Sequence, residues 1–282
     1  MPLPDRERLL RNLRVPTLPA LVQRLTRIID EPNAGTADVG LIIKEDPPLA
    51  GRVLRIANSS FYGLKEPCTS IEQASTVLGL RSLRNVVVQA ALIQGHVHLQ
   101  ALGLDLEGLW RDSVLAARTS SLITTLARSP LLPSPDEAYL TGLLSDIGQV
   151  VLLDNLGGEY VMLHEAARRH GLALHLAERR DLGLTHADAS AIVATTWGLP
   201  NVVRLGIEFH HGRRASDFAI PAAYLAIRSA QLVERVRAGN LGAAAAPIDA
   251  QAEKVLGITP EATAEAIARI QEGLAVGLED AA

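Results

Sequence analysis

The stretch Gly142-Leu143-Leu144-Ser145-Asp146-Ile147-Gly148 decides how the rest of the chain is read. It is an apolar helical run that ends in a small polar pair and a glycine. Upstream of it, Ser134-Pro135-Asp136-Glu137 has the spacing of a capping box with proline in the first helical turn, which predicts where this helix begins. We therefore expect a helix that starts after Ser134 and carries Ser145 and Asp146.

Similar helix-capping motifs occur on both sides of this stretch. Asp46-Pro47 and Ser70-Ile71-Glu72-Gln73 predict helix starts upstream, and Thr185-His186-Ala187-Asp188 predicts one downstream, with His186 in its first turn. No segment shows the alternation of apolar and polar residues that is typical of a strand. Apolar residues make up 48% of the chain and aromatic residues only 3%, so the core must be aliphatic, which favours helices. The predicted fold class is all-α.

The order of these helices predicts four parts in the 282-residue chain. Residues 1–14 are a short extension, residues 15–100 a subdomain of short helices, and residues 101–235 a second helical subdomain. The last part, residues 236–282, begins with a Gly/Ala-rich stretch that we interpret as a linker and ends in an amphipathic helix.

Composition excludes several classes of protein. The net charge of −4 and a pI of about 6.1 do not fit a surface that binds duplex nucleic acid. The single cysteine, Cys68, excludes an internal disulfide framework and fits a reducing compartment. No apolar run approaches the ~18 residues that a membrane span needs. We expect a soluble cytoplasmic protein that neither binds nucleic acid nor inserts into a membrane.

Two separated groups of motifs stand out in the chain. The first comprises Asp46-Pro47, Leu54, Ala57-Asn58-Ser59, Tyr62, Ser70-Ile71 and Leu78-Gly79-Leu80, and the second Trp110-Arg111-Asp112-Ser113, Gly142–Gly148, Glu178, Gly183, His186, Trp197-Gly198-Leu199-Pro200 and His210-His211. Together they resemble one family, the HDOD domain, the HD-related output domain of bacterial signalling proteins. The resemblance covers about Val15 to Arg235. It implies an all-helical fold with an HDOD-specific N-terminal subdomain and an HD-like C-terminal one, in a family described as regulatory and often without catalytic residues. Because the HD-GYP relatives hydrolyse cyclic-di-GMP, it also implies a link to that pathway.

The resemblance further implies where metal ligands of an HD phosphohydrolase would stand. The HD segment of such enzymes reads Gly-Leu-Leu-His-Asp-Ile-Gly, so Ser145 replaces its histidine while Asp146 is retained. Asp112 stands where the first family histidine is expected. The later histidines are retained as His186, His210 and His211. The last aspartate is expected near Ser229-Ala230-Gln231 and is missing there.

Two interpretations of these residues remain open. Asp112, Asp146, His186 and one of His210 or His211 could form a mixed nitrogen and oxygen ligand set for Fe, Mn or Zn. Alternatively, buried histidines and carboxylates satisfy one another without metal and tie helices together, for example through a bond from His186 to Asp146. Because the Ser145 hydroxyl is a poor metal ligand, we favour the structural interpretation and expect no cofactor.

The remaining motif residues are expected to have structural roles. Asn58 and Tyr62 would cap a helix and pack a joint, Glu178 would pair across helices, and Trp197 would anchor the core. Arginine pairs such as Arg168-Arg169 could bind a phosphate, although such pairs are usually solvated.

The resulting hypothesis is a non-catalytic signalling module that acts through protein–protein interaction and retains a degenerate HD metal site. One alternative is a divergent metal-dependent phosphohydrolase that acts on a nucleotide or cyclic dinucleotide. Another is a receptor for a cyclic dinucleotide.

Overall fold

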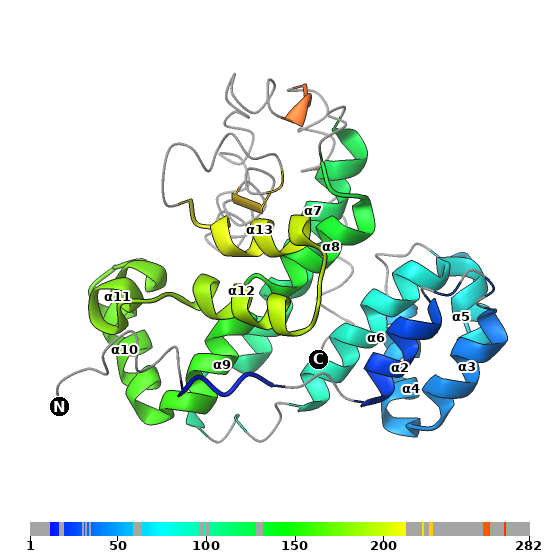
Figure 1. Cartoon of the computed structure of the whole chain (residues 1–282), viewed down its shortest axis with the longest axis horizontal. Helices are drawn as coiled ribbons and strands as arrows, with labels where there is room; N and C mark the ends of the chain where they lie inside the picture. Colours follow the sequence, from blue (N-terminus) through cyan, green and yellow to red (C-terminus); the bar gives the residue numbers. More distant parts are fainter. Residues whose placement is uncertain are drawn as a thin grey trace. The chain divides into compact units, whose positions relative to one another are not determined.

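In the computed structural model, every secondary-structure element of the described residues is a helix, and these residues contain no strand (Figure 1). These residues are 12–16, 20–29, 35–58, 64–95, 102–127 and 132–212, with isolated positions at 31, 33, 99, 222, 226–227, 256–259 and 268. The all-α prediction is confirmed. None of the described helices combines the length and the apolar character needed to cross a membrane.

The chain divides into two compact units. The N-terminal helical unit takes its described residues from Thr17–Val97 and Ala268–Ala282. The site-bearing unit takes them from Met1–Pro16 and His98–Ile267. Tyr62, the region around residues 229–231, and most of the predicted extension (1–14) and C-terminal part (236–282) lie outside the described residues.

In the N-terminal helical unit, five helices pack around aliphatic side chains. Helix α2 contacts α3 and α6, α3 contacts α5, and α4 contacts α6. Leu25, Ile43, Ile71 and Leu83 are fully buried between them. The helices are α2 (Ala20–Ile29), α3 (Thr36–Lys44), α4 (Pro47–Ala57), α5 (Ile71–Leu78) and α6 (Leu80–Gly95).

The caps of this unit agree in part with the sequence pattern. The Asp46 carboxylate accepts a hydrogen bond from the Leu49 N–H at 3.0 Å and caps α4. Ser70 caps α5 as expected, but Gln73 accepts from the Thr69 N–H at 2.8 Å, one residue before the cap. Helix α3 is capped at Gly35, where the Asp38 carboxylate accepts from the Gly35 N–H at 3.2 Å.

Asn58, the C-cap of α4, closes the loop that leads to α5. Its side-chain oxygen accepts from the Cys68 N–H at 2.7 Å, and its amide nitrogen donates to the Cys68 carbonyl at 2.9 Å. Both backbone groups of the buried Cys68 are thereby satisfied by one side chain.

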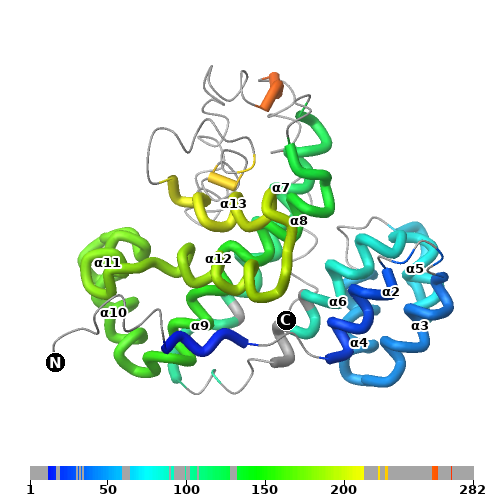
Figure 2. Tube along the Cα trace, in the orientation of Figure 1, coloured from blue at the N-terminus to red at the C-terminus, as the bar shows by residue number. Residues whose placement is uncertain are grey.

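The site-bearing unit is built around α8, which packs against α7 and α13, and around α12, which packs against α9 and α13. Helix α10 contacts α9 and α11, and Figure 2 follows the chain through this order. The helices are α7 (Leu106–Leu126), α8 (Pro135–Leu144), α9 (Ile147–Leu156), α10 (Gly158–Arg169), α11 (Leu174–Leu182), α12 (His186–Thr196) and α13 (Asn201–Phe209).

The Gly142–Gly148 stretch is not one helix. Helix α8 ends at Leu144, and Ser145 and Asp146 form the turn that connects it to α9. Gly148 lets α9 approach α12, because a Cβ there would overlap the His186 carbonyl oxygen. The Gly148 N–H donates to the Ser190 hydroxyl, which in turn donates to the Ser145 carbonyl, both at 2.7 Å. The turn is therefore fixed on both sides.

A short strap precedes the N-terminal helical unit in the chain and binds to the site-bearing unit. The Asn155 side chain accepts from the Arg14 N–H at 2.9 Å and donates to the Arg14 carbonyl at 3.0 Å. The indole N–H of Trp197, a half-buried residue, donates to the Pro16 carbonyl at 2.8 Å. Trp197 thus holds the backbone of residues 14–16 in place.

Candidate metal centre

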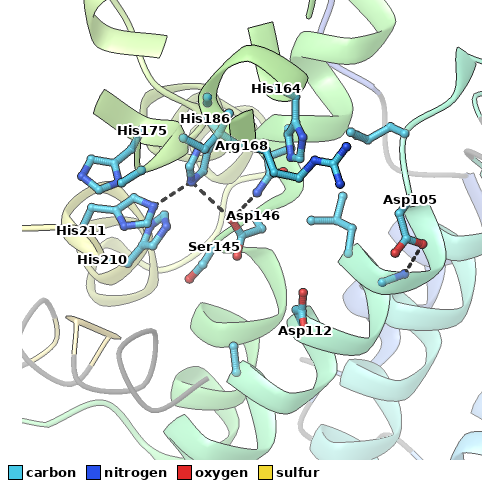
Figure 3. Close-up of a pocket in the computed structure, with 18 of the residues that line it drawn as sticks. Asp105, Asp112, Ser145, Asp146, His164, Arg168, His175, His186, His210 and His211 are labelled. Atoms are coloured by element: carbon cyan, nitrogen blue, oxygen red, sulfur yellow. Dashed lines mark hydrogen bonds and ion pairs between the residues drawn. The ribbon is translucent and has the colours of Figure 1, made fainter. Parts of the chain in front are cut away.

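Four side chains of the site-bearing unit converge at the junction of three helices. Asp146, His186, His210 and His211 each offer one ligand atom, and these atoms all lie within 4.8 Å of one another. Asp146 comes from the turn between α8 and α9, His186 is the first residue of α12, and the two other histidines directly follow α13 (Figure 3).

A capping box positions His186. The Thr185 hydroxyl accepts from the Asp188 N–H at 3.3 Å, and the Asp188 carboxylate accepts from the Thr185 N–H at 2.8 Å. This is the cap that the sequence spacing predicts. It starts α12 at His186, beside the Ser145–Asp146 turn that the contact at Gly148 holds.

Glu178 orients the His186 ring. The His186 Nδ1 lies 2.7 Å from Glu178 Oε2, which also accepts from the His186 backbone N–H at 2.9 Å. The Tyr160 hydroxyl donates to the other oxygen of Glu178 at 2.6 Å. Both partners of this pair are buried, with exposed side-chain fractions of 2% for His186 and 0% for Glu178. The remaining nitrogen, Nε2, is thereby directed to Asp146 Oδ1 at 3.3 Å and to His211 Nε2 at 2.8 Å.

The histidines differ in charge because their surroundings differ. Burial acts to lower the pKa of His186, but the charge and hydrogen bond of Glu178, together with Asp146 and Asp188, outweigh it and raise that pKa to about 9. Burial lowers the pKa of His210 to about 4, and nearby His186 adds to this effect. Without a metal, His186 is therefore charged at neutral pH while His210 is neutral.

The environment of His210 provides a test of whether a metal fits. Its Nδ1 lies 2.7 Å from the Ile207 carbonyl and donates to it, which leaves a lone pair on Nε2. That Nε2 is buried and has no hydrogen-bond partner. A buried lone pair without a donor is costly, and a cation would use it.

The donor set therefore fits a divalent ion such as Fe, Mn or Zn, held by the carboxylate of Asp146 and the imidazoles of His186, His210 and His211. Metal-binding histidines typically donate their other ring N–H to a carboxylate or a backbone carbonyl, as His186 and His210 do. A bound ion would supply Lewis acidity and could lower the pKa of a water molecule.

The two substituted family positions stand apart from this cluster. The Ser145 hydroxyl donates to the Thr141 carbonyl at 2.7 Å, within its own helix turn. Asp112, on α7, is half-buried and lines the same cavity, but it is not among the four residues whose ligand atoms converge. The structure brings together the other sequence-predicted ligand candidates and leaves Asp112 on the cavity wall.

Three contributors to the site escape sequence reasoning. Tyr160 supports Glu178 from 18 positions away, a separation without a motif. The His175 ring stacks on His211 with centroids 4.1 Å apart. Gln149 donates to Asp146 at 2.7 Å, and its position three residues after Asp146 is a helical spacing that could have indicated the contact.

The described part of the chain thus combines an all-helical fold with an Asp–His cluster at a helix junction. The model of the HDOD domain matches residues 15–213, and the chain belongs to this family.

Similar proteins are known from sequence and structure. An uncharacterized protein of Treponema pallidum (strain Nichols) is 28% identical over 202 residues, which cover 70% of this chain and 37% of that protein. The chain thus spans little more than a third of that relative. An HDOD domain protein of unknown function from Geobacter sulfurreducens superposes with a TM-score of 0.78 at 22% identity, covering 98% of this chain and 96% of that one.

Two further solved structures share the fold. A Shewanella amazonensis SB2B protein, provisionally named a phosphohydrolase, has a TM-score of 0.78 at 23% identity and covers 97% of this chain and 98% of its own. A Marinobacter aquaeolei VT8 protein, provisionally named a signal transduction protein, has a TM-score of 0.75 at 24% identity, with coverage of 99% and 62%.

Proposed function

We propose that the chain is a non-catalytic signalling module that acts by binding another protein, with its HD-like centre reduced to a single metal-ligand cluster. One observation carries the proposal. The Ser145 hydroxyl is engaged with the Thr141 carbonyl, so the position that supplies a histidine in HD phosphohydrolases supplies no ligand here.

The absence of a histidine at position 145 should impair hydrolysis of a phosphate more than it impairs binding of a metal ion. Metal-assisted hydrolysis of a phosphate needs ions held so that they activate water and also stabilise the leaving oxygen. The four convergent residues can surround one ion, and Asp112 is not among them. The remaining cluster fits a role in holding α9, α12 and α13 together.

The comparison with known structures supports a regulatory role at the level of the fold. The Marinobacter aquaeolei protein carries a signalling name, and this chain corresponds to only 62% of it. We propose the same kind of role for this chain, with a protein partner as its output and a pathway that uses cyclic-di-GMP as a candidate setting.

The catalytic part is tested by loading the full chain with Fe, Mn or Zn and assaying phosphodiester and nucleotide substrates. We expect no turnover above that of Asp146→Asn, which removes the carboxylate charge from the cluster. Turnover that is lost in Asp146→Asn and in His186→Ala would overturn the proposal. Ser145→His is assayed in parallel, because it restores the histidine that HD phosphohydrolases have at this turn.

The partner is tested by photo-crosslinking from surface positions in native cells, followed by reconstitution with the purified candidate. We expect one protein to bind directly and to bind equally well to Asp146→Asn. If reconstitution fails for every crosslinked protein, the interaction role is wrong.

A divergent metal-dependent phosphohydrolase is the second candidate, and a specific observation favours it. The buried Glu178–His186 pair and the unpartnered Nε2 of His210 have the arrangement of working metal ligands. The turnover assay above distinguishes it from the signalling module.

A further inference from the structure

The cavity beside the metal centre has a volume of about 360 Å³ and extends along helix α7. Asp112, Ala116 and Ser120 line it at intervals of four residues, so they share one face of that helix. Eight residues of helix correspond to ~12 Å, and the cavity is therefore elongated. Its volume lies near the lower end of the ~300–1,000 Å³ that ligand pockets usually have, which favours a small ligand.

Arg168 provides a cationic group at one side of the cavity. It stands four residues after His164 on the same face of α10, and both residues line the cavity that Figure 3 shows. Arg168 is exposed and, like its neighbour Arg169, has no ion-pair partner among the described residues, but of these two only Arg168 lines the cavity. A guanidinium that faces a cavity without a carboxylate partner suits an oxyanion, and phosphate above all.

Ser120 provides the second, independent observation. Its side chain is fully buried, and its hydroxyl oxygen has no hydrogen-bond partner. Ser113 and Thr124 on the same helix donate to the carbonyls four residues earlier, at 2.9 Å each, so Ser120 leaves unused a bond that its neighbours make. A buried polar atom without a partner on a cavity wall indicates a polar group of a ligand.

The cavity wall carries apolar and small side chains as well as the carboxylates of Asp105, Asp112 and Asp146. Leu109, Leu172 and Leu174 line it, together with Ala116 and Gly142. Such a wall accommodates a ring system better than a chain of charges.

We propose that this cavity binds a phosphorylated molecule of mononucleotide size, with its phosphate at Arg168 and a hydrogen-bonding ring at Ser120. The inference rests on the proposed function, because a ligand that is bound and not hydrolysed would be the input of a signalling module. The cavity is too small to favour a cyclic dinucleotide, which carries two nucleotides.

The test is calorimetric titration of the metal-free full chain with AMP, GMP, CMP and UMP, and with inorganic phosphate and the matching nucleosides. We expect at least one mononucleotide to bind about tenfold more tightly than phosphate alone or its nucleoside.

Matched variants locate the ligand. Arg168→Ala should weaken binding by about tenfold or more, whereas Arg169→Ala removes a neighbouring exposed arginine that does not line the cavity and should have no effect. Ser120→Ala should weaken binding about two- to tenfold, whereas Ser113→Ala, whose hydroxyl bonds within the helix, should leave it unchanged.

The inference is overturned if none of the four mononucleotides binds, or if Arg168→Ala binds the nucleotide as tightly as the parent does. Recovery of the nucleotide after incubation with metal-loaded protein separates the two proposals. Released phosphate would contradict the non-catalytic function but not the binding site. If the nucleotide stays intact and the titration shows no binding, only the binding site is contradicted.

Discussion

Ion pairs of the N-terminal helical unit lie in solvent, whereas the pair at the centre of the site-bearing unit is buried. The side chains of Arg24 and Glu45 are each 51% exposed, while His186 and Glu178 are almost wholly enclosed. Exposed pairs add little to stability because water screens them. Buried pairs cost desolvation and persist only with complete hydrogen bonding, as Tyr160 and the His186 N–H provide for Glu178.

The difference in burial between these ion pairs points to the site-bearing unit as the part of the chain that carries the function. The N-terminal helical unit is explained by its aliphatic core and its caps. The site-bearing unit carries buried charges that an aliphatic core would not need, and they surround the metal-ligand cluster and its cavity.

The largest effect is expected from Glu178→Ala. Removing the carboxylate leaves His186 without its charge partner and Tyr160 without an acceptor, and breaking a buried pair in this way costs about 3–5 kcal/mol. Tryptophan fluorescence during urea unfolding measures the effect, because both tryptophans, Trp110 and Trp197, lie in the site-bearing unit. A loss below 1 kcal/mol would mean that the buried pair is not what distinguishes this unit.

Glycine-to-alanine changes compare helix packing in the two units. Gly148→Ala should destabilise by about 3 kcal/mol, because the new methyl group overlaps the His186 carbonyl and α9 must move away from α12. Gly51→Ala, in the middle of α4, meets no atom within 4 Å and should stabilise by up to about 1 kcal/mol. Tryptophan fluorescence during urea unfolding measures the effect of Gly148→Ala, and hydrogen exchange in α4 measures the effect of Gly51→Ala. Equal effects would contradict the difference in packing.

The pH dependence of stability in the metal-free protein should come mainly from the site-bearing unit, whose shifted histidines are buried. The pKa of His186 is raised to about 9, so its contribution to stability is complete below pH 6.5 and is lost as the pH rises through 9. The pKa of His210 is lowered to about 4, so stability falls as the pH drops from 6.5 towards 4. Urea unfolding by fluorescence should give an optimum near pH 6.5. In His186→Gln the alkaline decline should disappear, and its persistence would exclude His186 as the cause.

The smallest effect is expected from Arg24→Ala in the N-terminal helical unit. The Arg24–Glu45 pair is open to solvent, so hydrogen exchange in α2 and α3 should not change measurably. A clear loss of protection there would show that exposed pairs matter in this unit after all.

Much of this fold follows from local sequence rules. The Asp46 cap fixes the start of α4, and the capping boxes that begin at Ser134 and Thr185 fix the starts of α8 and α12, because each cap bonds within a few residues of itself. The break after Leu144 does not follow from them, since the residues of Gly142–Gly148 are all compatible with a continuous helix. What ends α8 there is tertiary: the Ser190 hydroxyl, 45 residues away, accepts from one side of the turn and donates to the other.

The site was accessible from sequence only through family spacing. Asp146, His186, His210 and His211 are brought together by helix packing, which no local pattern encodes. The same limit explains why the separation of Asp112 and the support from Tyr160 were not foreseen. Arg168 was visible as part of a charged pair, but only coordinates distinguish it from Arg169 as the residue that faces the cavity.

The Tyr160–Glu178–His186 relay gives the centre a reporter of its own. The phenol proton is buried and bonded to a carboxylate at 2.6 Å, so we expect its exchange with water to be slow. Burial and Glu178 raise the pKa of Tyr160, which keeps that proton in place across the working range. Any event at the opposite nitrogen of His186 changes the charge that Glu178 shares between its two oxygens. Binding of an ion at the metal-ligand cluster can therefore be followed through Tyr160, which does not contact the ion itself.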